Sequence, residues 1–110
     1  MVIDAWRRQI LEDCPGLVLI SGRTLLVGVG CLEFAITQAE ANSLVVIGME
    51  GFRTDGVALT PLIEFVADLD EVDGVWAERV RSSSEAARSI AAAWSRGPEF
   101  IELVLAAQDE

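Results

Sequence analysis

The sequence predicts a single α+β domain over residues 1–110, with a small, mostly antiparallel sheet that contains a central hairpin and packs against about three helices. The expected order is α-β-α-β-β-α-β. A chain of 110 residues has the usual size of one domain, and 52% hydrophobic residues with a mean hydropathy of +0.41 supply apolar surface for a core. Apolar residues recur at helical spacing in three segments, and the turn pair Asp55-Gly56 separates two long apolar runs.

The N-terminal segment predicts a helix followed by a strand. Asp4 can act as the helix N-cap, and Pro15-Gly16 ends the helix. Its apolar residues recur at the spacing of one helix face: Ile3, Trp6, Ile10 and Cys14. The next run, residues 17–20, is short and partly β-branched, which is typical of a strand. The sequence of residues 24–30 does not distinguish between secondary structures, although its two glycines argue against a long helix.

Two further helices and a last strand are expected. Four apolar residues follow the i, i+3, i+4, i+7 pattern, with Asn42 as a suitable stop: Leu32, Ala35, Ile36 and Ala39. The third helix is expected to begin at the capping box Ser82-x-x-Glu85 and to end at a left-handed Gly97 before Pro98. Its buried face would be Ala87, Ile90, Ala91 and Trp94. Residues 100–105 alternate as a strand.

The hairpin is the strongest short-range signal. A two-residue turn at Asp55-Gly56 would pair Thr54 with Val57 and set the register of the two flanking runs. One face would then carry Leu44, Val46, Gly48, Glu50, Phe52, Leu59, Pro61, Ile63, Phe65 and Ala67. The other would carry Val45, Ile47, Met49, Leu62 and Val66, interrupted by Glu64 and Asp68. Because both faces are largely apolar, helices must cover both or a partner must cover one.

The net charge and the cysteine content indicate which class of partner and which cell compartment to expect. The chain has 18 acidic and 8 basic residues, a net charge of −10. This field repels phosphate backbones and anionic lipids, so we expect no nucleic-acid or membrane binding and favour a basic protein partner. No signal peptide and no long apolar span are evident, which predicts a cytoplasmic protein. Cys14 and Cys31 would then be reduced core residues.

The residue types argue against an enzyme. The chain has no histidine, which excludes Ser–His and Cys–His pairs and the usual zinc sets. Gly28-x-Gly30 lacks the third glycine of a dinucleotide fingerprint. Residues 68–74 resemble a calcium loop, but Val72 and Arg79 stand at two ligand positions and the glycine is displaced. We therefore expect no catalytic residues, no metal and no cofactor.

The acidic segment after the hairpin is the candidate binding site. Trp76 lies in a stretch without clear periodicity, so it either plugs the core or anchors an interface. Neighbouring carboxylates repel one another, and a basic partner would relieve that repulsion. The candidate partner-binding residues are Glu64, Asp68, Asp70, Glu71, Asp73 and Trp76.

In general form the chain resembles small bacterial immunity proteins, which neutralise a toxin domain by covering its active site. The resemblance rests on Glu50-Gly51-Phe52-x-x-Asp55-Gly56, Pro61, the acids of residues 68–73 and the closing strand, and it covers the C-terminal two-thirds loosely. It implies an inhibitor of a toxin or enzyme that acts by surface contact. Barstar-like proteins share the acidity, but the antiparallel hairpin departs from their parallel sheet, so no site residues are carried over.

Two alternatives remain open from the sequence. The first is a structural homo-oligomer, such as a homodimer, that uses the apolar hairpin face of Val45, Ile47, Met49 and Leu62. The second is a small-ligand-binding domain with a pocket between sheet and helices, although the sequence offers no convergent polar set for one.

Overall fold

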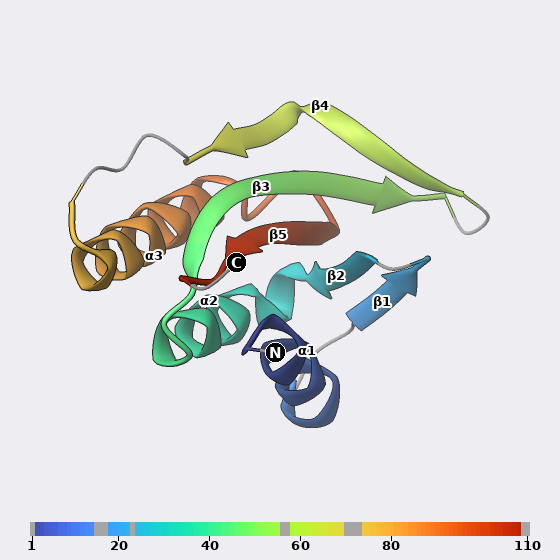
Figure 1. Cartoon of the computed structure of the whole chain (residues 1–110). Coiled ribbons are helices and arrows are strands. Elements are labelled where there is room, and N and C mark those ends of the chain that lie inside the picture. The colour runs from blue at the N-terminus through green and yellow to red at the C-terminus, as the bar shows by residue number, and fades with distance from the viewer. Residues whose placement is uncertain (1, 15–17, 23, 56–57, 70–73, 109–110) are drawn as a thin grey trace.

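The computed structural model has an α+β fold of three α-helices and a five-stranded antiparallel sheet (Figure 1). It describes residues 2–14, 18–22, 24–55, 58–69 and 74–108. The elements are α1 (Val2–Asp13), β1 (Val18–Ser21), β2 (Thr24–Gly28), the 3-10 turn η1 (Val29–Cys31), α2 (Leu32–Ala41), β3 (Val45–Thr54), β4 (Leu59–Asp68), α3 (Trp76–Ala93) and β5 (Phe100–Ala106). The predicted fold class and element order are confirmed, and β2 occupies the stretch that indicated no single state.

The last strand holds the sheet together. The strand order is β1-β2-β5-β3-β4, so β5 lies between the β1–β2 and β3–β4 hairpins and pairs antiparallel with β2 and β3. The two hairpins form from neighbouring segments, whereas β5 pairs with β3 about half the chain away and with β2 about two-thirds of the chain away. Figure 1 shows β5 between the two hairpins and β3 bending strongly along its length.

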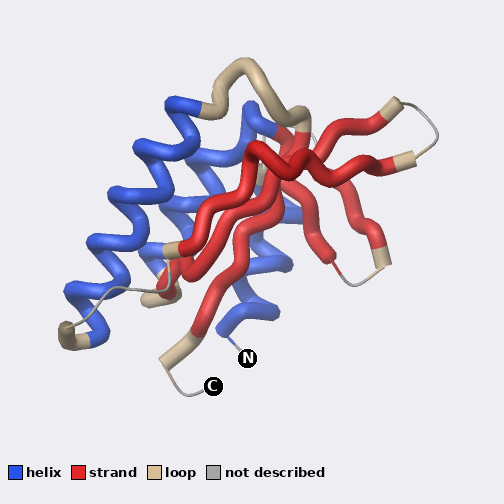
Figure 2. Tube along the Cα trace, turned by 90° about the horizontal axis from the view of Figure 1, so that it is seen from above, coloured by secondary structure: helices blue, strands red, loops and turns tan. Residues whose placement is uncertain are grey.

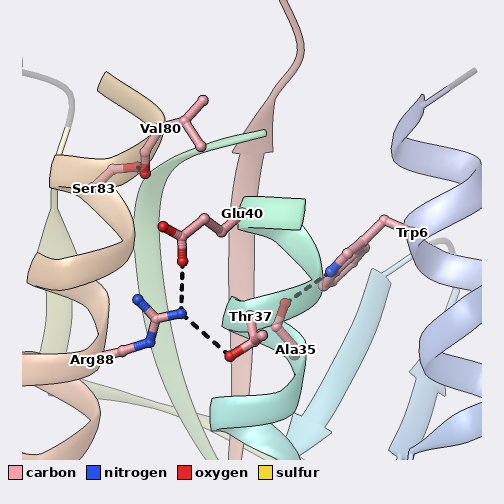
Figure 3. Close-up of polar contacts among 7 residues, drawn as sticks. All are labelled: Trp6, Ala35, Thr37, Glu40, Val80, Ser83 and Arg88. Carbon is pink, nitrogen blue, oxygen red and sulfur yellow. Dashed lines mark hydrogen bonds and ion pairs between the residues drawn. The ribbon is translucent and has the colours of Figure 1, made fainter. Parts of the chain in front are cut away.

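The helices pack against one side of the sheet (Figure 2). The core between these layers includes Trp6, Ile10, Leu32, Ala35, Ile36, Ala39 and Ala87 from the helices and Leu25, Val27, Val46, Met49, Ile101 and Leu103 from the strands. The predicted buried sides of the first two helices are confirmed. The Trp6 indole N–H also donates to the Ala35 carbonyl at 3.0 Å, which joins α1 to α2 (Figure 3). None of the described helices is long and apolar enough to span a membrane.

The hairpin register differs from the predicted one. Thr54 pairs with Leu59, and the Asp55 side chain accepts a hydrogen bond from the Ala58 amide at 2.8 Å, so the connection is longer than two residues. A second shift falls between Glu50, which pairs with Val66, and Gly51, which pairs with Leu62. The three residues between Leu62 and Val66 form a bulge. Side chains beyond this bulge therefore lie on the face opposite to the predicted one.

The third helix begins earlier than the sequence predicted. It starts at Trp76, so the proposed capping box Ser82-x-x-Glu85 lies inside the helix. Trp94 forms the C-cap, and Gly97 does not have a positive φ. In the first helix, likewise, Asp4 is in the first turn and is not the N-cap. The capping-box pattern did not mark the start of α3. Contacts with distant residues hold its first turns, because Trp76 bonds to Ser43 in the α2–β3 turn and Ser83 bonds to Val46 in the sheet.

The two cysteines form a disulfide, which corrects the expectation that they are separate thiols. Cys14 follows α1 and Cys31 ends η1, and their Cα atoms are 6.1 Å apart. This separation is typical of a disulfide. The bond joins the end of the first helix to the turn that begins the second.

Candidate protein-interaction face

Three adjacent strands present two rows of side chains away from the helices. Across β4, β3 and β5, the first row is Asp68, Gly48 and Val104, and the second row is Val66, Glu50 and Glu102. Met49 and Leu103, which alternate with these residues, lie in the core. Helix α1 borders these rows at β5, where Ile3, Trp6 and Arg7 line a hollow together with Glu102 and Val104. We call these six residues the open face.

A pair of carboxyl groups lies at the centre of the open face. Glu50 and Glu102 are direct cross-strand partners, and their side chains form a hydrogen bond. Partial burial, the charge of Glu50 and this hydrogen bond together raise the pKa of Glu102, while the charge of Arg7 acts in the opposite direction. Like charges directly opposite each other destabilise a sheet, so the pair is a local cost to folding when both groups are ionised.

Apolar side chains flank this carboxyl pair. Val66 is 57% exposed and Val104 is 37% exposed. Between them a hollow of about 320 Å³ opens over Gly48, lined also by Glu50, Ala67 and Asp68. Exposed apolar side chains beside charged ones are typical of surfaces that bind other proteins.

Of the predicted site residues, the structure describes Glu64, Asp68 and Trp76. Asp68 ends β4 and belongs to the open face. Glu64 is exposed in the β4 bulge, so it does not share a regular row with Asp68 as the sequence suggested. The other three predicted carboxylates, Asp70, Glu71 and Asp73, lie outside the described residues. Their role in binding stays a prediction.

Trp76 has a structural contact of its own. Its indole N–H donates to the carbonyl oxygen of Ser43 at 2.8 Å, which ties the start of α3 to the turn between α2 and β3. The Arg79 guanidinium lies 5.1 Å from the centre of the indole ring, and the ring is half-buried. These contacts tie Trp76 to the fold, but it is not part of the core cluster, and its role in binding stays a prediction.

The apolar hairpin face expected for self-association does not exist as an exposed surface. Val45 and Met49 are buried within the chain, and Ile47 and Leu62 are half-buried. The bulges in β3 and β4 interrupt the regular alternation that placed these four residues together.

Sequence reasoning did not select Glu50 and Glu102. A signal was present, because each is a carboxylate inside an otherwise apolar strand. The missing information was strand order, since only the pairing of β3 with β5 makes the two glutamates neighbours.

A groove of about 490 Å³ lies between α2 and α3. Its polar group Arg88 already donates to Glu40 at 2.8 Å and to Thr37 at 3.2 Å (Figure 3). The remaining lining is mainly apolar, so the groove lacks a convergent set of polar groups for a specific ligand. Within the described ranges, no three Cys, Asp or Glu side chains are grouped to hold a metal ion.

Comparison with known proteins gives little similarity. No family model and no solved structure matches the chain. A transport inhibitor response 1-like protein of rice (Oryza sativa subsp. japonica) is 34% identical in an alignment 67 residues long that covers 59% of this chain. The chain spans 12% of that protein's length, so the similarity concerns one short part of a much longer protein.

Proposed function

We propose that this protein is a binding module that acts by surface contact on a basic protein, through the open face of its sheet. The observation that carries the proposal is the Glu50–Glu102 pair beside two exposed valines, Val66 and Val104. Burying this face would remove apolar surface from water, and a cation brought by the partner would relieve the carboxyl repulsion.

The overall charge supports the same kind of partner. A net charge of −10 attracts basic proteins over a distance of about one Debye length, roughly 10 Å at moderate salt. Asp68 brings one residue of the predicted acidic segment onto the open face. In this proposal the protein is a bacterial, immunity-like inhibitor that covers the functional surface of a toxin or enzyme and is not itself an enzyme.

We propose a cytoplasmic location, and the Cys14–Cys31 disulfide bears directly on it. A reducing cytosol would keep Cys14 and Cys31 as thiols, whereas an oxidising compartment would preserve their bond. Because Cys31 is fully buried and Cys14 half-buried, neither residue is part of the open face. Contact through the open face is therefore expected in both redox states, provided that the fold persists.

The test compares two variants with the same loss of charge. One carries Glu50→Gln, Glu102→Gln and Asp68→Asn on the open face. The control carries Glu12→Gln, Asp13→Asn and Glu33→Gln, at exposed positions on α1 and α2. The wild-type protein is used to capture the partner from its own cells, and the purified partner is then measured against all three proteins at two salt concentrations.

The open-face variant is expected to bind at least about tenfold more weakly, which is about 1.4 kcal/mol, and to associate at a rate that depends less on salt. The helix variant should bind nearly as tightly as the wild type, with a smaller change that reflects net charge alone. Equal losses in the two variants, or no loss in either, would rule out the open face as the binding surface.

A further inference from the structure

The hollow over Gly48 exists because this position has no side chain. Gly48 lies in the row between Asp68 and Val104, on β3, which is next to the edge strand β4. A Cβ atom built there would lie 3.6 Å from the Val104 Cβ and 3.4 Å from the Ala67 carbonyl oxygen. Alanine would therefore fit in ordinary contact, and a larger side chain would extend into the hollow.

The lining of the hollow combines two chemical characters. Val66 and Val104 provide apolar sides, while Glu50 and Asp68 provide carboxylates from two neighbouring strands. Glu102 lies beside Glu50 in the second row. A group that fits this surface needs an apolar stem and a cationic end that can reach carboxylates on more than one strand.

We propose that the hollow over Gly48 receives a single arginine side chain of the partner protein. This inference rests on the proposed function and specifies the group that the open face recognises. The methylene stem lies against Val66 and Val104, and the guanidinium bonds to Glu50 and Asp68. Arginine fits better than lysine because its planar guanidinium presents five donors in a fixed fork and is more weakly hydrated than an ammonium group.

The test uses a defined probe, N-acetyl-arginine methylamide, with its lysine and citrulline counterparts. Citrulline has nearly the shape of arginine but no charge. Each compound is titrated into the full-length protein while backbone amide signals are followed by NMR. The variants are Gly48→Val, which fills the hollow, and Gly30→Ala, a control in η1 where an added Cβ meets nothing within 4 Å.

The arginine compound is expected to give saturable shifts at Gly48, Val66 and Val104, with a dissociation constant on the order of millimolar. The lysine compound should bind several-fold more weakly and citrulline not measurably. Gly48→Val should lose the binding while keeping a folded spectrum, and Gly30→Ala should retain it. If Gly48→Val does not fold, Gly48→Ala is used and should weaken the binding.

Three results would overturn the inference: no saturable shift, equal binding of lysine or citrulline, or unchanged binding by a folded Gly48 variant. The test of the proposed function can fail independently of the test of the arginine site. If neutralising the open face weakens partner binding but filling the hollow does not, the arginine site is wrong and the binding face stands. If neutralisation has no effect on partner binding, the proposed function is wrong whatever the probe shows.

Discussion

The hydroxyl oxygen of Ser83 on α3 accepts a hydrogen bond from the backbone amide of Val46 on β3, with the two atoms 3.0 Å apart. Both residues are fully buried, and the Ser83 hydroxyl in turn donates to the Val80 carbonyl. The bond lies where the β3–β5 register shifts between Val46 and Gly48. A side chain of the helix thus satisfies a buried amide of the strand next to this irregularity.

Ser83→Ala is expected to lower the free energy of unfolding by about 1–3 kcal/mol, because the buried Val46 amide would be left without a partner. The neighbouring Ser84 provides a matched control. Its hydroxyl is buried without a hydrogen-bond partner among the described residues, so Ser84→Ala should be neutral or stabilising. Urea unfolding of both variants measures the difference. Equal losses would show that the Ser83–Val46 bond contributes nothing specific.

Gly97→Ala is expected to destabilise the protein by about 1–3 kcal/mol through overpacking. A Cβ atom at Gly97 would overlap the Phe65 ring, which itself packs edge-on against Trp94 with ring centres 5.6 Å apart. Gly30→Ala, where the added methyl meets open space, should change the stability by less than about 0.5 kcal/mol. Thermal melts of the two variants test this, and a neutral Gly97→Ala would contradict the close approach.

Glu102→Gln is expected to stabilise the protein increasingly as the pH rises. Because burial and Glu50 raise the pKa of Glu102, the folded state keeps its proton where the unfolded chain has lost it. Wild-type stability therefore falls as the pH rises from the ordinary carboxyl range through the raised pKa. Glutamine cannot ionise, so the variant lacks this loss.

The measurement for Glu102→Gln is urea unfolding of wild type and variant between about pH 4 and pH 7, a range that spans the ordinary glutamate pKa and values above it. The variant's advantage should grow with pH and then level off. Glu33→Gln, at an exposed position on α2, serves as the control and should show no such trend. A constant difference between wild type and Glu102→Gln would exclude the raised pKa.

Reduction of the Cys14–Cys31 disulfide is expected to cost about 3 kcal/mol, from the chain entropy of a loop that closes over 17 residues. The double variant Cys14→Ala, Cys31→Ala should show a similar loss, and its stability should not respond to reductant. Unfolding curves with and without dithiothreitol provide the test. A wild type whose stability is insensitive to reductant would contradict a stabilising bond.

Much of the fold could be predicted from the sequence because its signals are local. The spacing of Leu32, Ala35, Ile36 and Ala39 places them on one side of α2, and all four are buried. The alternation of Ile101 and Leu103 with Glu102 likewise predicted β5 and its buried side. These patterns arise from the helix and strand periods, which depend only on neighbouring residues.

The start of α3, the hairpin register and the open face were decided by tertiary contacts. Trp76 begins α3 where its indole bonds to Ser43, and the β4 bulge contains Phe65, which packs against Trp94. Glu50 and Glu102 become neighbours only because β5 inserts between the two hairpins. Strand order depends on which apolar surfaces meet when distant segments pack, and no local period encodes that choice. The sequence by itself therefore determined the fold class, most of the helices and strands and the acidic character of this protein, and the tertiary structure decided where α3 begins and which carboxylates share a surface.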